Sequence, residues 1–346
     1  MPKKNFFISW VGLDVSKDTF TAAIQTISEE NASFPEQDSF PISRAGVRQL
    51  LKWVRGRTGD VACGIAMEST GRYSEKLALL ILKEAPEQHV SICNPLAVSR
   101  YRSSFTDAKA DLHVDPKYIA KFACDRQPEA YEPRTQENAE LRELVRERAA
   151  MVEALQQFRS RQEDLRFKAA MDANRQVEAM LKRKIEALDK AIRAVVERSG
   201  EISREIGLMT TVPGVALLSA ATIYAELGTL SAYSRRQLSA LSGVCPVMRQ
   251  SGTSLQKGTM SRKGSRLLRR ILFLDSQQAI ARIPSMASFH ERLLHRPNSS
   301  RMTAKCACMR KLLLILRGIV VSGKEFDPQH IPENFAHSEK KGEKTA

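Results

Sequence analysis

The feature that most constrains the fold is the stretch from 136 to 206, which contains no proline and a single glycine, Gly200. Charged residues of both signs alternate there with Leu, Val, Ile and Met at three- and four-residue steps. This spacing predicts long amphipathic helices, and we expect a coiled-coil-like hairpin with its turn near 171–176. A solvated helix pair that acts as a spacer fits the same pattern, and dimerisation is a further alternative.

The chain before this stretch alternates strand-like and helix-like patterns. An apolar run and a second β-prone run within residues 6–24 predict a hairpin. Residues 61–67 and 89–95 are further strand candidates, and the helical pattern of 71–85 lies between them. This order predicts an α/β layer with a mixed sheet.

Asp14 interrupts the apolar run of the first predicted strand. Burying a lone carboxylate in a sheet costs several kcal/mol unless the group is paired, hydrogen-bonded or bound to a metal. Alternatively, Asp14 ends the strand and caps a turn together with Ser16 and Asp18. These residues alone favour the turn-cap interpretation.

The last third of the chain contains two features of interest. Residues 210–228 predict two helical segments joined at a Pro-Gly bend, a pattern that resembles a helix–hairpin–helix and its phosphate-binding loop. Residues 251–270 combine Gly and Ser with many cations and lead into a basic helix. This segment is either a solvated loop or a loop that holds a phosphate and carries a nucleophile.

The charge balance points to a polyanionic partner. The 346 residues include 54 Lys and Arg against 39 Asp and Glu, a formal net charge of +15. Nucleic acid is the usual partner of so basic a protein, and an anionic membrane surface is the rival. No apolar run reaches the length of a membrane span, and the N-terminus lacks an export signal, so we expect a cytoplasmic protein. The six cysteines lack zinc spacing and are expected to be reduced, mostly buried thiols, with a metal at 306–308 as the less favoured alternative.

Acidic residues recur where strands and helices are expected to meet. Asp14 lies on the first strand, Glu68 closes another, and Asp107, Asp111 and Asp115 cluster further along. Converging carboxylates suit Mg²⁺, which prefers oxygen ligands and supports phosphodiester chemistry. An acidic surface cluster without a metal is the alternative.

Five sequence motifs, taken in order, resemble those of the DEDD-type transposases of bacterial insertion sequences, a group that includes Piv-like DNA invertases. They extend over nearly the whole chain, from about residue 8 to 325. The motifs are GLDVSKDTF, MESTGRY, NPLAVSRYRSS with KADLHVDPKYIAKFA, VPGVALLSAATIYAELG and RQSGTSLQKGTMSRKGSRLLRR.

The resemblance implies an α/β domain followed by helical domains. We expect a RuvC-like, ribonuclease-H-type catalytic domain over 1–135 and a coiled-coil-like segment over 136–206. A mostly helical C-terminal transposase domain with the serine loop and the helix–hairpin–helix-like motif would span 207–330, and 331–346 would be a disordered tail.

The resemblance also implies site residues. The four metal-binding acids fall on Asp14, Glu68, Asp111 and Asp115, and Asp107 is an alternative ligand. The last two acids are separated by three residues, where family members usually have two, and Pro116 replaces a usual Ala. An Asp followed by Pro is also the pattern of a helix start, so Asp115 is alternatively a helix cap.

The nucleophile of this family falls on Ser251, and Ser254 and Ser261 are alternatives in the same loop. A serine hydroxyl needs activation and a positioned target before it attacks. The cations expected to neutralise DNA phosphates are Arg249, Lys257, Arg262, Lys263, Arg266, Arg269 and Arg270.

No helix for reading bases stands out in the sequence. The resemblance implies that a structured bridge RNA pairs with target and donor DNA, so that the protein recognises shape and charge. We therefore expect an insertion-sequence transposase that cuts and rejoins double-stranded DNA through a phosphoserine, as a homodimer or homotetramer associated with the bacterial nucleoid. The alternatives are a RuvC-like structure-specific nuclease that uses water, and a non-catalytic nucleic-acid-binding relative.

Overall fold

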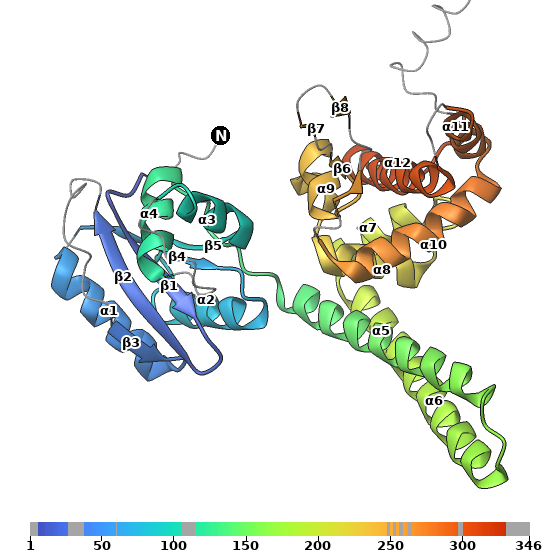
Figure 1. Ribbon diagram of the computed structural model, residues 1–346, viewed down its shortest axis with the longest axis horizontal. Coiled ribbons are helices and arrows are strands. Elements are labelled where there is room, and N and C mark those ends of the chain that lie inside the picture. Colours follow the sequence, from blue (N-terminus) through green and yellow to red (C-terminus); the bar gives the residue numbers. More distant parts are fainter. Residues whose placement is uncertain are drawn as a thin grey trace, which may run out of the picture. The chain divides into compact units, whose positions relative to one another are not determined.

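The computed structural model divides the chain into two compact units, Met1–Pro133 and Arg134–Ala346 (Figure 1). The structure describes residues 6–26, 38–59, 61–105, 115–247, 250–251, 254–255, 259–261, 264–296 and 300–329. The predicted tail at 331–346 lies outside these ranges.

The first unit is built on a five-stranded mixed sheet of order β3-β2-β1-β4-β5. The strands are β1 (Ser9–Val15), β2 (Thr19–Thr26), β3 (Asp38–Pro41), β4 (Cys63–Glu68) and β5 (Val90–Cys93). Strands β1, β2 and β3 pair antiparallel, whereas β4 pairs parallel with both β1 and β5. The predicted hairpin, the two later strands and the mixed sheet are confirmed.

Helices cover both faces of this sheet. They are α1 (Arg44–Thr58), α2 (Arg72–Glu84), α3 (Pro95–Arg102) and α4 (Pro116–Arg126). Val11 and Leu13 of β1 pack into a core with residues of α1 and α2, whereas Trp10 packs with residues of α3 and α4. Because both faces of β1 are buried, its sequence is a nearly continuous apolar run.

The second unit begins with a helical hairpin. It consists of α5 (Gln136–Gln162) and α6 (Lys168–Arg198), which confirms the predicted long helices. The turn lies at 163–167, so the segment 171–176 belongs to α6 and the predicted position of the turn was too late. Asn174 is buried there, and its side-chain amide donates to the Phe158 carbonyl at 3.0 Å and to Gln162 Oε1 at 2.8 Å.

The remaining helices join the base of this hairpin in one core. They are α7 (Gly200–Thr210), α8 (Leu217–Leu227), the 3₁₀ turn η1 (Leu230–Ala232), α9 (Arg235–Leu241), α10 (Arg266–Arg282), α11 (Pro284–Leu294) and α12 (Arg301–Ser322). Leu141 of α5, Ile192 of α6, Ile223 of α8 and Leu312 of α12 are fully buried in this core. The mostly helical character predicted for this region is confirmed, and four short strands lie between α9 and α10.

The Pro-Gly bend joins α7 to α8 as predicted. Gly214 has a φ of +98°, and a Cβ at this position would lie 2.7 Å from Gln278 Cβ of α10. The bend is therefore packed against the protein's own helix. All six cysteines are free thiols, as expected. Across the described ranges, no helix is long and apolar enough to cross a membrane.

Candidate active site

Asp14 and Glu68 lie next to each other at the ends of two parallel strands. The pairing of β1 with β4 runs from Ser9 opposite Cys63 to Leu13 opposite Met67. Asp14 and Glu68 are the next residues on their strands, so they occupy the same row of the sheet. Neighbouring strands lie about 4.8 Å apart, and residues two apart share a face, so both carboxylates lie on the face that carries Trp10 and Ala66.

Glu68 has an environment that ordinary carboxylates avoid. Its Oε1 is buried and has no hydrogen-bond partner within the part of the chain that the structure describes. Burial and then the neighbouring Asp14 carboxylate raise the pKa of Glu68, and the Arg102 guanidinium opposes this shift. A buried oxygen of this kind is costly unless a ligand or cation binds it.

Helix α4 brings the predicted fourth acid to the same part of the sheet. A Cβ on Gly12 would lie 2.0 Å from the Pro116 carbonyl oxygen and 2.4 Å from the Ala120 nitrogen, so the first turns of α4 lie directly on β1. Asp115 immediately precedes this turn as its N-cap. The glycine is required because any side chain would displace the helix backbone.

The Asp115 carboxylate is engaged by its own helix. Oδ1 accepts a hydrogen bond from the Lys117 backbone N–H at 3.0 Å, and Oδ2 lies 3.4 Å from Lys117 Nζ. Pro116 occupies the first helical position. The prediction that Asp115 caps a helix is therefore confirmed. This cap lies next to the row formed by Asp14 and Glu68.

Two of the predicted acids fall outside the described residues. These are Asp107 and Asp111, and the same holds for the predicted phosphate-binding residues Arg249, Lys257, Arg262 and Lys263. Among the residues that the structure does describe, no three His, Cys, Asp or Glu side chains gather as a metal site. The described acidic site consists of Asp14 and Glu68, with Asp115 at its edge.

The predicted nucleophile lies on one of four short strands between α9 and α10, which we call the serine hairpin (described residues 245–247, 250–251, 254–255 and 259–261). Its strands are β6 (Pro246–Val247), β7 (Gln250–Ser251), β8 (Ser254–Leu255) and β9 (Thr259–Met260). Strand β6 pairs with β9, and Ser251 is opposite Ser254 in the pairing of β7 with β8. Ser261 closes the base, where its backbone N–H donates to the Cys245 carbonyl at 3.0 Å. Ser251 and Ser254 are thus a cross-strand pair, and Ser261 lies at the base of the hairpin.

The described arginines after the hairpin contact the protein itself. Arg269 donates to the Gly264 carbonyl at 2.9 Å, while Arg266 and Arg270 reach Glu153 and Gln156 of α5 at 3.3 and 3.2 Å. The Arg266 side chain is 87% exposed. An exposed ion pair contributes about 0–1 kcal/mol, so the contact with Glu153 leaves Arg266 able to bind a phosphate.

Comparison with known families separates the chain into two matched regions. Residues 11–165 match the IS110 family model described as "Transposase", and residues 207–291 match the one described as "Transposase IS116/IS110/IS902 family". The chain carries two IS110-family transposase domains. It is a DNA transposase or recombinase enzyme. The first match begins within β1 and contains the acidic row, and the second contains the serine hairpin and α10.

Relatives of known name extend over almost the whole transposase. The pilin gene-inverting protein of Moraxella bovis is 25% identical over 326 residues, which cover 92% of this chain and 98% of the relative. The pilin gene-inverting protein of Moraxella lacunata matches with the same identity and coverage. The similarity therefore includes both matched regions and the helical hairpin.

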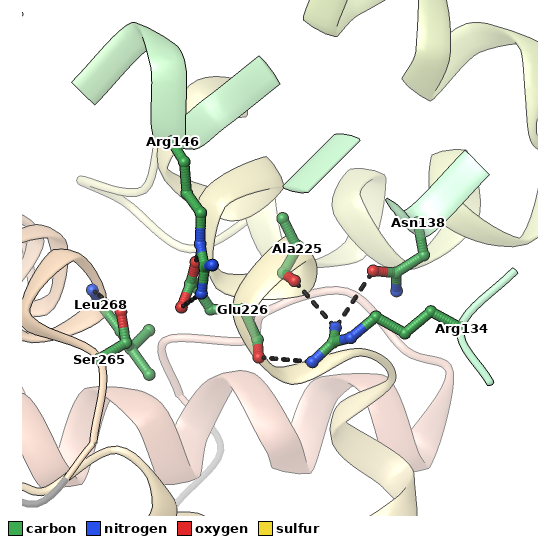
Figure 2. Close-up of polar contacts among 7 residues, drawn as sticks. All are labelled: Arg134, Asn138, Arg146, Ala225, Glu226, Ser265 and Leu268. Atoms are coloured by element: carbon green, nitrogen blue, oxygen red, sulfur yellow. Dashed lines mark hydrogen bonds and ion pairs between the residues drawn. The ribbon is translucent and has the colours of Figure 1, made fainter. Parts of the chain in front are cut away.

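Two residues of the transposase were missed by sequence reasoning. Arg102 lies within the motif at 94–104 and acts on the pKa of Glu68. Glu226 is the one acid in the largely apolar segment 212–228, and it binds Arg146 of α5 (Figure 2). A lone charge in such a segment indicates that it has a buried partner. The sequence does not identify that partner, because Arg146 is 80 residues away.

Proposed function

We propose that this transposase cuts and rejoins DNA through a covalent bond between Ser251 and a strand end, with Mg²⁺ at the acidic row and a structured RNA as guide. The observation that carries the proposal is the row formed by Asp14 and Glu68, in a chain whose second matched region contains the serine hairpin. An antiparallel three-stranded meander extended by two parallel strands supports the ribonuclease-H-type assignment of the first unit.

The residues of the acidic row fit a divalent cation. Within the described structure, Glu68 presents a buried oxygen without a partner. Its pKa is raised first by burial and then by the neighbouring Asp14 carboxylate, and a bound cation would oppose both effects. Asp14 and Glu68 would hold the ion, and Asp111 and Asp115, with Asp107 as the alternative, would complete the set. When bound, Mg²⁺ supplies positive charge to the phosphate that reacts. Asp115 would have to exchange its contact with Lys117 for this role.

The proposed reaction conserves the phosphodiester bond energy. The Ser251 hydroxyl oxygen forms a bond to phosphorus, the bond from phosphorus to a sugar oxygen breaks, and the serine proton passes in net terms to that oxygen. A sugar hydroxyl of another strand reverses the exchange and restores Ser251. Because the bond energy is kept in the serine–phosphate link, rejoining needs no high-energy cofactor. This property suits an enzyme that exchanges DNA strands. The gene-inverting activity named for the Moraxella relatives supports this proposal.

The proposed guide RNA rests on charge and on the family resemblance. The net charge of +15 favours binding to nucleic-acid backbones, and the resemblance provides recognition by base pairing. The protein would then bind DNA and RNA backbones through shape and charge, as a homodimer or homotetramer.

The test is to trap a covalent species on a nicked DNA substrate in Mg²⁺ and to map it by mass spectrometry. We expect an adduct on Ser251 that is lost in Ser251→Ala and retained in Ser254→Ala and Ser261→Ala. An adduct that persists in Ser251→Ala would reassign the nucleophile. Cleavage that leaves free ends and no adduct in any variant would favour the nuclease alternative instead.

A further inference from the structure

Helix α1 carries a row of cations along its exposed side. Arg44, Arg48, Lys52 and Arg55 follow one another at steps of four, four and three residues, so they lie within one narrow sector of the helix. All four residues are exposed, and the buried residues of α1 lie on the opposite side, against the sheet. Helix α1 is described over its whole length and contains no Asp or Glu. We call these four residues the α1 basic stripe.

One carboxylate of α2 orders the first two arginines of the stripe. Glu84 Oε1 accepts from Arg44 Nε at 2.9 Å, and Oε2 accepts from Arg48 Nε at 2.7 Å. The hydrogen bond from Arg48 is the largest of the effects that hold the pKa of Glu84 below its ordinary value, so the carboxylate stays ionised. The two arginine side chains nevertheless remain 64% and 69% exposed. Both bonds use Nε, so the Nη ends of two ordered guanidinium groups can bind a further anion such as a phosphate.

The stability of the fold does not explain these charges. Arg44 is the first residue of α1, and the first turn contains no acid. The N-terminus of a helix carries partial positive charge, so a cation there costs about 0.3–1 kcal/mol and an acid would be favoured. Cations four residues apart also repel each other. Exposed ion pairs such as those with Glu84 contribute only about 0–1 kcal/mol. A bound anion would convert these repulsions into attraction.

The shape of the stripe fits a chain of phosphates. An α-helix rises about 1.5 Å per residue, so neighbouring cations lie about 5–6 Å apart along the axis and the stripe is about 16 Å long. A regular row of cations suits the regular charges of a nucleic-acid backbone better than it suits one small anion. The positive end of the α1 dipole adds to the attraction for phosphate.

The α1 basic stripe and the acidic row lie on opposite faces of one sheet. Val11 and Leu13 of β1 pack in the core that contains residues of α1, whereas Asp14 shares the face of Trp10, which packs with α3 and α4. Helix α1 is itself about 10 Å across, and the sheet lies beneath it. A straight duplex bound at the acidic row therefore does not run along the stripe. The stripe fits a second nucleic acid, distinct from the DNA segment that is cut.

We infer that the α1 basic stripe binds the phosphate backbone of the structured RNA while DNA occupies the acidic row. The inference rests on the proposed guide RNA and adds the surface that holds it. Phosphate contacts carry no sequence information, so this mode of binding leaves the bases of the RNA free to pair with DNA.

The first test removes the charge of the stripe. The triple variant Arg48→Gln, Lys52→Gln and Arg55→Gln keeps residues that favour a helix and leaves Arg44 paired with Glu84. The probe is a fluorescently labelled RNA hairpin of arbitrary sequence, titrated at several salt concentrations. We expect the RNA Kd to rise at least about tenfold and the slope of log K against log salt to decrease by about 2–3.

A matched control removes the same charge elsewhere. Lys184→Gln, Lys190→Gln and Arg193→Gln change three exposed cations of α6. We expect this variant to bind the RNA hairpin with a Kd within about threefold of the native value. An equal loss of affinity in the two triple variants would overturn the inference, because the effect would then reflect net charge alone.

Crosslinking decides which nucleic acid lies on the stripe. The photoreactive residue p-benzoylphenylalanine replaces Gln49, which is exposed and adjoins Arg48. The full-length protein is assembled with the RNA hairpin and a DNA duplex that carry different labels. We expect crosslinks to RNA from position 49 and few from the same residue placed at Lys184. Crosslinks to DNA alone, or none above the Lys184 control, would overturn the assignment to RNA.

The proposed reaction is scored separately. At saturating RNA, the stripe variant should form the Ser251–DNA adduct within about threefold of the native rate, because the stripe lies away from the acidic row. Loss of the adduct under these conditions would overturn the inference by placing the stripe in the reaction. An adduct that persists in Ser251→Ala would refute the role of Ser251, whereas RNA affinity and crosslinking would still decide the role of the stripe.

Discussion

Asp14 and Glu68 occupy one row of the mixed sheet, immediately after the last backbone pair that joins β1 to β4, Leu13 with Met67. Their side chains share the face that carries α4, and Glu68 keeps a buried oxygen without a partner in the described structure. Two adjacent carboxylates repel each other in the absence of a cation, so this row costs folding free energy in the metal-free protein. A cation bound by the two carboxylates would offset this cost.

Glu68→Gln and Asp14→Asn each remove one charge at nearly constant shape. We expect cleavage in Mg²⁺ to fall by about 100-fold or more, because a bound metal supplies several kcal/mol of stabilisation to the reacting phosphate. Thermal unfolding in a chelator should occur at an unchanged or higher temperature, since the repulsion is relieved. Native cleavage rates in either variant would show that the row does not serve the reaction.

Gly12→Ala tests whether the contact of α4 with β1 holds the site together. The new Cβ would lie 2.0 Å from a backbone oxygen of α4, and the helix must move to admit it. We expect a loss of about 1–3 kcal/mol or more in stability together with loss of cleavage. Gly56→Ala in α1 is the control, because no described atom lies within 4 Å of its new Cβ. That variant should be more stable by about 0.5–1 kcal/mol.

Asp275 makes the stability of the helical unit depend on pH. It is 5% exposed on α10, and Oδ1 accepts from the Ser219 hydroxyl at 2.9 Å. Burial raises its pKa from 3.8 to about 7, against the opposing effect of the Ser219 hydrogen bond. The folded protein therefore holds a proton that the unfolded chain has released between these values. The resulting stabilisation is complete below about pH 4 and is lost as the pH rises through 7.

Asp275→Asn removes this titration. Relative to the variant, the native protein should lose up to about 4 kcal/mol of stability between pH 4 and pH 8. Thermal unfolding of both proteins from pH 4 to pH 8 measures the difference, and we expect the variant to be the more stable at pH 8. Parallel curves would mean that Asp275 stays charged throughout.

We expect Arg266 and Arg269 of α10 to affect different steps: Arg266 mainly DNA affinity, and Arg269 mainly the rate of adduct formation. Arg266→Ala removes a highly exposed cation, so DNA affinity should fall and the slope of log K against log salt should decrease by about 1. Arg269→Ala removes the donor to the Gly264 carbonyl and should slow adduct formation more than it weakens binding. Arg198→Ala on α6 is the control for net charge. Equal salt slopes in all three variants would refute the assigned difference.

The guide RNA is tested on the purified protein. We expect a structured RNA encoded near its gene to be recovered by sequencing, and recombination to fail after ribonuclease treatment. Random cellular RNA together with unimpaired recombination would refute the guide role. Ser251→Ala should retain the same RNA, because the proposed recognition is by charge and shape.

Much of the secondary structure follows from the sequence. The spacing of apolar residues correctly predicted the opening hairpin, strands β4 and β5, helix α2 and the two long helices, because periodicities of 2 and 3.6 reflect which face is buried. The Asp-Pro pair correctly indicated a helix start at Asp115. The turn of the long hairpin was misplaced, since no Gly or Pro marks residues 163–167 and the packing of α5 on α6 decides where the chain reverses.

The sequence by itself determined that Asp14 lies on a strand and Glu68 at the end of another. Only the tertiary structure decided that they share a row, because the register of parallel strands depends on the connection between them and on the packing of helices over both faces. It also decided that Glu226 meets Arg146, 80 residues distant in the chain. Local patterns record burial and backbone preference, whereas a pair of side chains from distant segments is set by the packing of whole elements.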